Sequence, residues 1–193
     1  MELVRPELSL IEADYWRAVM YATLRQQLRD RPISGNGIEF GGSNGVIQGF
    51  CPAVEWETRG YPEYDVLDSK VWDGHWDVVV LDMVLEHVPR PWEVFRYLDQ
   101  HAETAIITVP FLIGIHLCPD DCWRMTPSAI RQLGEPYYSD IDIRTWGNAE
   151  VAYLHAAYND TGTLLKAERR RALGVLMGND PDKPFDIWAV LRR

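Results

Sequence analysis

Residues 37–45 read GIEFGGSNG, and this stretch decides the fold class. An apolar run with one acid, Glu39, leads directly into a turn in which three of five residues are glycine. This pattern predicts a strand followed by a tight turn, because glycine adopts backbone angles that other residues avoid. In open α/β sheets, ligands bind at the strand ends where the strand order reverses. We therefore expect a ligand here, close to the backbone of the small residues Gly41, Ser43 and Gly45.

Apolar runs and turn signals predict the remaining elements. The unbroken run at residues 77–81 is typical of a strand buried on both faces of a parallel sheet. The expected strands are residues 37–40, 53–58, 65–67, 77–81, 104–109, 140–145 and 185–191. The expected helices are residues 9–30, 91–100, 127–133, 150–158 and 164–177, and one that begins at Val46. Their alternation predicts an α/β fold: a doubly wound, mostly parallel seven-stranded sheet with an antiparallel edge and helices on both faces.

The length of 193 residues suits a single domain. We expect a helical cap at residues 1–32, a ligand-binding core at residues 37–146, and the last helices and strand at residues 147–193. No apolar run approaches the roughly 20 residues of a membrane span, and the start lacks a secretory pattern. Three scattered cysteines do not form a disulfide framework, which favours a cytoplasmic location.

The formal net charge of −10 argues against a polyanionic partner. The basic residues near position 170 spread around a predicted helix and are interpreted as a solvated face. We therefore expect no nucleic-acid or membrane partner, and a homodimer is possible. Eight tryptophans and nine tyrosines are many for this length, and some could line a pocket for an organic or sugar-like ligand.

The turn at residues 41–45 has other interpretations. A dinucleotide site would favour G-x-G-x-x-G rather than the spacing found here. The pattern G-x-S-x-G also matches the nucleophile elbow of lipases, with Ser43 as nucleophile, but that elbow normally follows several strands. A plain glycine-rich turn without a ligand is the third alternative.

Three motifs, in this order, resemble the class I S-adenosylmethionine-dependent methyltransferases. EFGGSNG at residues 39–45 resembles the first motif of the family, with serine in place of the middle glycine. WDVVVLDMVLEHVPRP at residues 76–91 resembles the fourth strand and its turn. ITVPF at residues 107–111, His116 and PDDCWRMTP at residues 119–127 resemble a subgroup. The resemblance covers about residues 35 to 135, and the usual K-P-G-G before the fifth strand is missing.

The resemblance implies S-adenosylmethionine as cofactor and S-adenosylhomocysteine as product. The turn would hold the methionine part, with Glu39 beneath it. Glu57, or else Glu55, would accept hydrogen bonds from the ribose hydroxyls. Asp68, or else Asp65, would face the adenine. The implied cofactor-binding residues are Glu39, Gly41, Ser43, Gly45, Glu57, Asp68, Asp82 and Met83, the last two near the sulfonium. Glu57 and Asp68 could equally be exposed turn carboxylates.

Two histidines in the similar region are candidate catalytic residues. His116 lies in a long loop where substrate could reach it, and an imidazole can accept a proton near neutral pH. His116 could instead fix the loop through hydrogen bonds, and His87, which follows the fourth strand of the family pattern, could be a structural or cofactor-side residue. Asp120, Trp123 and Arg124 would shape the acceptor pocket, although Arg124 could instead pair with Asp120 or Asp121 and only fix the loop.

A metal site receives less support. His116, Cys118, Asp120, Asp121 and Cys122 are metal-capable and close in sequence, but structural zinc usually has a second pair of ligands. We therefore expect no metal.

The sequence thus predicts methyl transfer to a small molecule, with the oxygen of a sugar or secondary metabolite as the favoured acceptor. Carbon or nitrogen acceptors stay open. A non-catalytic module that binds the cofactor or a partner on the same fold is the alternative, and the glycine spacing disfavours a nicotinamide oxidoreductase.

Overall fold

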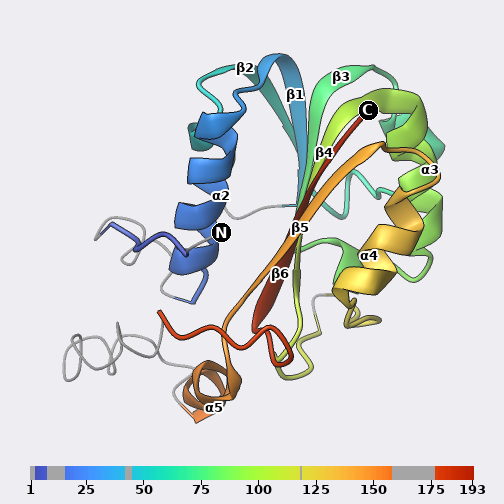
Figure 1. The fold of residues 1–193 in the computed structure, drawn as a ribbon. Helices are drawn as coiled ribbons and strands as arrows, with labels where there is room; N and C mark the ends of the chain where they lie inside the picture. Colours follow the sequence, from blue (N-terminus) through green and yellow to red (C-terminus); the bar gives the residue numbers. More distant parts are fainter. Residues whose placement is uncertain (1–2, 8–15, 42–44, 118, 158–176) are drawn as a thin grey trace.

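A computed structural model describes residues 3–7, 16–41, 45–117, 119–157 and 177–193. Within these residues the chain forms one six-stranded mixed sheet with the order β2-β1-β3-β4-β6-β5 (Figure 1). The strands are β1 (Ser34–Gly41), β2 (Ala53–Arg59), β3 (Trp76–Asp82), β4 (Ala102–Pro110), β5 (Asp140–Trp146) and β6 (Asp186–Arg192). The helices are α2 (Ala18–Asp30), α3 (Pro91–His101), α4 (Pro127–Gly134) and α5 (Ala149–Ala157), with short 3-10 helices η1 (Gln48–Phe50), η2 (Ser69–Val71) and η3 (Leu85–His87).

Parallel pairing joins the first four strands. β1 lies between β2 and β3, so that Glu39 is level with Thr58 on one side and with Val80 on the other. β6 runs antiparallel to both β4 and β5. The expected antiparallel end of a mostly parallel sheet is therefore confirmed, although β5 is the outermost strand and β6 lies inside it.

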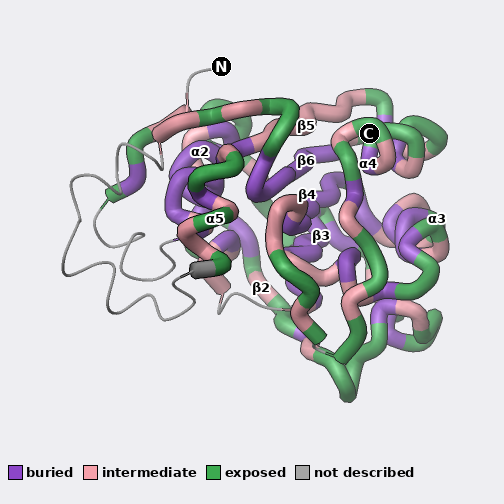
Figure 2. Tube along the Cα trace, turned by 90° about the horizontal axis from the view of Figure 1, so that it is seen from below, coloured by how far each residue is buried: buried purple, intermediate pink, exposed green. Residues whose placement is uncertain are grey.

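Helices cover both faces of the sheet, as predicted. α2 packs on one face, where its Tyr21 and Leu24 join Val78, Val80 and Ile106 in one buried cluster (Figure 1). α3 and α4 cover the opposite face. Figure 2 looks onto the carboxyl ends of the parallel strands and shows buried positions along β3, β4 and β6. The core is thus two apolar layers separated by the sheet.

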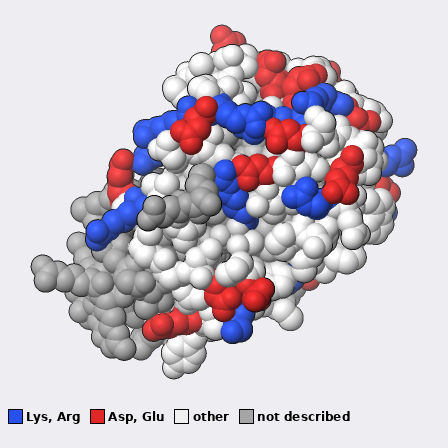
Figure 3. Space-filling view, viewed as in Figure 1, with Lys and Arg blue, Asp and Glu red and all other residues white. Residues whose placement is uncertain are grey.

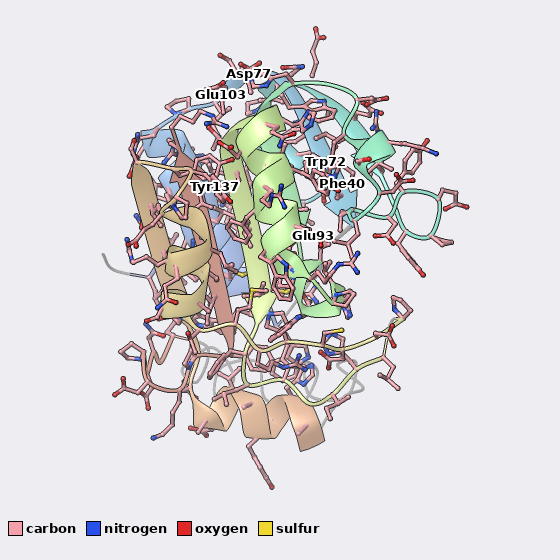
Figure 4. All side chains as sticks on the ribbon, turned by 90° about the vertical axis from the view of Figure 1, so that its right-hand side faces the viewer. Phe40, Trp72, Asp77, Glu93, Glu103 and Tyr137 are labelled. Carbon is pink, nitrogen blue, oxygen red and sulfur yellow. The ribbon has the colours of Figure 1, made fainter. Side chains whose placement is uncertain are left out.

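An aromatic cluster anchors the segment after β2 to the α3 face. Phe40 at the end of β1 lies 4.8 Å from Trp72, measured between ring centroids, and Trp72 stacks on Tyr97 of α3 at 5.6 Å. Figure 4 shows Phe40 and Trp72 together beside α3. The Trp72 indole also donates a hydrogen bond to the carbonyl of Val66 at 3.0 Å, which fixes this connection against the sheet.

The predicted strand at residues 65–67 is wrong, so six of the seven predicted strands are present in the described residues. These residues lie in a turn, and β2 is the edge strand. Asp65 accepts a hydrogen bond from the Leu67 amide at 2.9 Å, and Asp68 accepts one from the Lys70 amide at 3.0 Å. Two aspartates that each accept a hydrogen bond from the amide two residues further along favour turns over an extended strand.

The predicted helix from Val46 is also wrong. Residues 45–47 form a turn, and the 3-10 helix η1 follows. Few residues separate Gly45 from Pro52, and the residue before a proline avoids helical backbone angles. Among the described residues, the connection from β3 to β4 is therefore the crossover between parallel strands that contains an α-helix, α3. Helices cover both faces, but the described residues do not confirm the regular helical crossovers of a doubly wound sheet.

Two predicted helices lie partly or mostly outside the described residues. The first is described from its turn at Trp16 and is helical from Ala18. Most of the predicted helix at residues 164–177 lies outside the described part. The helix predicted at 150–158 is confirmed as α5, where the Asn148 side chain accepts a hydrogen bond from the Val151 amide at 3.0 Å.

In the described part of the chain, each helix falls short of the length and apolar character that crossing a bilayer requires.

Candidate active site at the carboxyl edge of the sheet

The candidate site lies where β1, β3 and β4 end. The chain leaves β1 toward β2 on one side and returns as β3 on the other, so that the strand order reverses at this point. Gly41 at the end of β1 is level with Asp82 at the end of β3, and Asp82 is level with Thr108 of β4. In Figure 1 this edge points downward, toward α5. A reversal of this kind is where open α/β sheets bind ligands.

The turn after β1 depends on glycine at its first position. Gly41 has a φ of +83°, and a Cβ atom there would lie 2.4 Å from Cγ2 of Val84. Gly45 has a φ of +73°. Residues that carry a side chain rarely adopt this left-handed backbone conformation, so glycine is favoured at both positions. Ser43, the third predicted residue of this turn, lies outside the described residues.

Glu39 is a fully buried carboxylate on the α2 face of the sheet. Neither of its oxygens has a well-formed hydrogen bond from a described residue. Burial raises the pKa of Glu39 to about 7; the Gln48 amide partly opposes this shift, and the carboxylate of Asp82 adds to it. A carboxylate in this position is suited to a cationic ligand group, because such a group would compensate its lost hydration.

Asp82 and Met83 end β3 in a constrained arrangement. Asp82 is buried and accepts hydrogen bonds from the hydroxyls of Tyr21, at 2.9 Å, and Thr108. Met83 has a φ of +54°, and its amide donates to the Thr108 hydroxyl at 3.0 Å. A non-glycine residue in this conformation is uncommon and is held by its surroundings. The strand end is therefore rigid beside the candidate site.

The loop at residues 111–126 docks on the turn that follows β3. The amides of Cys122 and Trp123 both donate to the carbonyl of Glu86, at 2.7 and 3.1 Å. The indole of Trp123 donates to the carbonyl of Val88 at 2.9 Å. Through these bonds, a segment that follows β4 closes over residues that follow β3.

A partly buried ion pair stiffens this loop internally. The guanidinium of Arg124 binds both carboxylate oxygens of Asp121, with one contact of 2.7 Å, and donates to the carbonyls of Ile113 and Gly114. Hydrogen bonds from Arg124 hold the pKa of Asp121 well below its usual range. Asp121 also accepts the His116 amide at 2.8 Å. The loop therefore holds His116 in place.

Glu86, His87 and His116 meet at this contact. The rings of His87 and His116 lie 5.1 Å apart with an interplanar angle of 87°. Oε1 of Glu86 lies 3.7 Å from Nε2 of His87. Burial raises the pKa of Glu86 to about 8, which its own backbone amide and the charges of Arg17 and Arg124 oppose and that of Asp82 reinforces.

Solved structures of known proteins share the fold of this chain. An S-adenosylmethionine-dependent methyltransferase from Archaeoglobus fulgidus matches with a TM-score of 0.55 and 12% identity, covering 97% of this chain and 100% of that chain. This chain has the methyltransferase fold. The YcgJ protein from Bacillus subtilis matches with a TM-score of 0.53 and 8% identity, over 90% and 97% of the two chains.

A Haemonchus contortus phosphoethanolamine N-methyltransferase bound to S-adenosylhomocysteine matches the methyltransferase fold of this chain with a TM-score of 0.51 and 10% identity. The match covers 94% of this chain and 56% of that chain. No protein-family model and no curated protein sequence matches the chain. At these identities the structures have the fold in common, so the chemistry of this chain has to be argued from its own site.

The methyltransferase fold brings the predicted residues of β1 and β3 together. Gly41 is level with Asp82, and Glu39 lies two residues earlier on β1, level with Val80. Glu57 lies elsewhere: it is level with Ile38, so its side chain leaves the sheet on the face opposite Glu39. Its carboxylate is half exposed and accepts a 2.7 Å ion-paired hydrogen bond from Arg59.

The other predicted acids lie in exposed positions. Glu55 is exposed on β2, and Asp65 and Asp68 use their carboxylates to hold turns. In the loop, Asp120 is exposed, and its carbonyl oxygen is hydrogen-bonded to Nδ1 of His87. Of the two predicted partners of Arg124, the structure selects Asp121.

Four residues of the site were missed by sequence reasoning. Tyr21 and Thr108 hold Asp82, and Gln48 donates to the Thr58 hydroxyl at 2.8 Å beside Glu39. Glu86 stands within a quoted motif, but nothing in the order of residues 81–91 shows that its carboxylate is buried. Each of these roles depends on contacts between distant segments or on burial, and local sequence patterns specify neither.

Proposed function

We propose that this chain is a methyltransferase that moves a methyl group from S-adenosylmethionine to a small molecule. Glu39 carries the proposal: it is a buried carboxylate without a well-formed hydrogen bond from the described residues, two positions before the left-handed Gly41 at a reversal of strand order. The ammonium group of an amino acid would supply the missing charge and hydrogen-bond donors. A dinucleotide pyrophosphate would be repelled by the same carboxylate.

Residues of this edge fit the proposed cofactor. When bound, S-adenosylmethionine supplies a methyl group that is already activated on a sulfonium. Glu39 would bind its amino group, while Gly41, Gly45 and the neighbouring Ser43 would leave room for the rest of the methionine part. Asp82 and Met83 would line the cofactor near the sulfonium, in an orientation fixed by their hydrogen bonds.

The nucleoside end of the proposed cofactor is assigned by resemblance. Glu57 is proposed for the ribose hydroxyls and Asp68 for the adenine. Glu57 would then share its carboxylate between the ribose and Arg59, and Asp68 would bind while still capping η2.

The acceptor is proposed to be a small hydroxylated metabolite, such as a sugar or a secondary metabolite. Trp123, which is 40% exposed, lies with Asp120 and Arg124 in the loop that would border the acceptor. Acidic and basic side chains are mixed over the face seen in Figure 3, in keeping with a small organic acceptor rather than a polyanion. His116 in this loop and His87 in η3 are the candidate bases that would take the proton of an acceptor hydroxyl.

Calorimetric titration with S-adenosylmethionine, S-adenosylhomocysteine and NAD tests the cofactor. We expect the first two to bind and NAD not to bind. Glu39→Gln should weaken S-adenosylmethionine binding about 10- to 100-fold, because a charge-assisted hydrogen bond is lost. Glu103→Gln, at the opposite end of the sheet (Figure 4), is the matched control and should bind normally.

Two further results would change the assignment. Binding of NAD in place of S-adenosylmethionine would contradict the proposal, and unchanged affinity in Glu57→Ala would remove Glu57 from the ribose site. Transfer of a labelled methyl group to a panel of hydroxylated acceptors tests catalysis. Cofactor binding without any labelled product would favour the non-catalytic module.

A further inference from the structure

We propose that Glu86, His87 and His116 bind a divalent transition-metal ion of the Zn²⁺ type. Each of the three side chains offers one ligand atom, and these atoms lie within 4.8 Å of one another. Ligand atoms at about 2.0–2.2 Å from a zinc ion are roughly 3–4 Å apart. Side-chain rotations that move the ligand atoms by about 1 Å would therefore bring all three within bonding distance of one ion.

The carboxylate of Glu86 has the character of a ligand without its cation. The Glu86 side chain is 1% exposed, and neither oxygen accepts a well-formed hydrogen bond from a described residue. Burying a carboxylate in this way is unfavourable unless a hydrogen bond, an ion pair or a metal compensates it. Oε1 of Glu86 lies 3.7 Å from Nε2 of His87, and an ion between these two atoms would be bound by both.

Backbone carbonyls orient both imidazoles for coordination. Nδ1 of His87 is hydrogen-bonded to the carbonyl of Asp120, and Nδ1 of His116 lies 3.2 Å from the carbonyl of Gly114. A carbonyl accepts only from a protonated nitrogen, so in the neutral rings the lone pair is on Nε2. Metal-binding histidines typically donate their second N–H to a carbonyl or carboxylate in this manner.

The ligands belong to two segments that are firmly joined. Glu86 and His87 form part of η3, and His116 comes from the loop after β4. The Glu86 carbonyl binds two loop amides, while Asp121 holds the His116 amide and is itself held by Arg124. The three ligands are therefore brought together before any ion binds, which lowers the ordering cost of binding.

The donor set selects the class of ion. Imidazole nitrogen suits zinc and other transition metals, whereas Mg²⁺ and Ca²⁺ prefer oxygen ligands. Three protein ligands leave coordination positions open, as in catalytic zinc sites. If the proposed function holds, an open position could bind the acceptor oxygen and favour loss of its proton. In that role His87 and His116 act as ligands rather than as bases.

Metal binding can be tested without an acceptor. Chelator-treated protein is titrated with Zn²⁺ by calorimetry, and with Co²⁺ to detect the visible absorption of coordinated cobalt. We expect about one ion per chain. Glu86→Gln and His116→Ala should each weaken Zn²⁺ affinity at least about tenfold and reduce the Co²⁺ absorption. His75→Ala, which removes a histidine paired with Glu103 at the other end of the sheet, should change neither.

The variants are compared only after circular dichroism and thermal melting show that they fold like the wild type. If His116→Ala does not fold, Glu86→Gln serves as the test, because glutamine keeps the shape of the glutamate side chain. Absence of Zn²⁺ binding, or equal affinity in the ligand variants and wild type, would overturn the metal site. S-adenosylmethionine titration of the metal-free protein separates the two proposals: cofactor binding without zinc binding rejects only the metal site, and zinc binding without cofactor binding rejects only the proposed function.

Discussion

Glu39 is an ionisable residue at a position from which the fold excludes water. Its side chain is fully buried, and its pKa is raised from an ordinary value of 4.5 to about 7. At the scale of the residue, this carboxylate opposes folding when it is charged. A cationic ligand would reverse that penalty, so stability and binding depend on the same side chain.

The pH dependence of stability should report this carboxylate. Between about pH 4.5 and 7 the folded protein holds a proton on Glu39 that the unfolded chain has released, so the contribution of Glu39 to stability should fall as pH rises and level off above about pH 7. The contribution of Glu86 should keep falling to about pH 8. The decrease at Glu39 is at most about 3 kcal/mol. Urea unfolding from pH 5 to 8.5, in the presence of a chelator, measures it.

Glu39→Gln is the comparison for that measurement. The variant should lose this part of the pH dependence, while the contribution of Glu86, which has the same sign, is present in both proteins. Parallel stability curves for the two proteins would show that the pKa of Glu39 is not raised in the folded protein.

At the scale of the element, the turn between β1 and β2 requires glycine at one position. Gly41 has a left-handed backbone, and an added Cβ would overlap Val84, whereas a Cβ at Gly49 in η1 would meet no atom within 4 Å. Gly41→Ala should reduce the free energy of unfolding by about 1–3 kcal/mol. Gly49→Ala should be nearly neutral. Chemical denaturation compares the two, and equal stability would contradict the geometry of the turn.

The elements differ in how well the sequence predicted them. The buried strands β1, β3 and β4 were predicted because their apolar runs match burial on both faces. The strand at residues 65–67 failed because Asp65 and Asp68 hold turns through their own backbone. The helix from Val46 failed because Pro52 follows too closely. Local hydrogen bonds and chain length overrode the residue pattern in both cases.

At the scale of the whole molecule, Gln27 joins α2 to the far end of the sheet. This 4% exposed side chain donates to Asp142 of β5 at 2.7 Å and accepts from the Trp188 indole of β6 at 3.2 Å. Gln27→Leu should cost about 1–3 kcal/mol, because it leaves the buried Trp188 indole without its acceptor. It also removes one donor from Asp142, which keeps its ion pair with Arg144. The neighbouring Gln26→Leu, at a half-buried position whose amide makes a solvent-exposed hydrogen bond to Asp30, should stay within about 0.5 kcal/mol. Thermal and urea unfolding distinguish them, and equal losses would refute this role.

The sequence by itself determined the α/β class, the glycine turn after β1 and the candidacy of Glu39, because strand burial and tight turns depend on residues that are neighbours in the chain. Only the tertiary structure decided which side chains meet at the strand ends. Tyr21, Asp82 and Thr108 come from three separate elements, as do the residues that surround Glu86. Their contacts depend on strand order and loop docking, which bring together groups distant in sequence, and no local pattern encodes those distances.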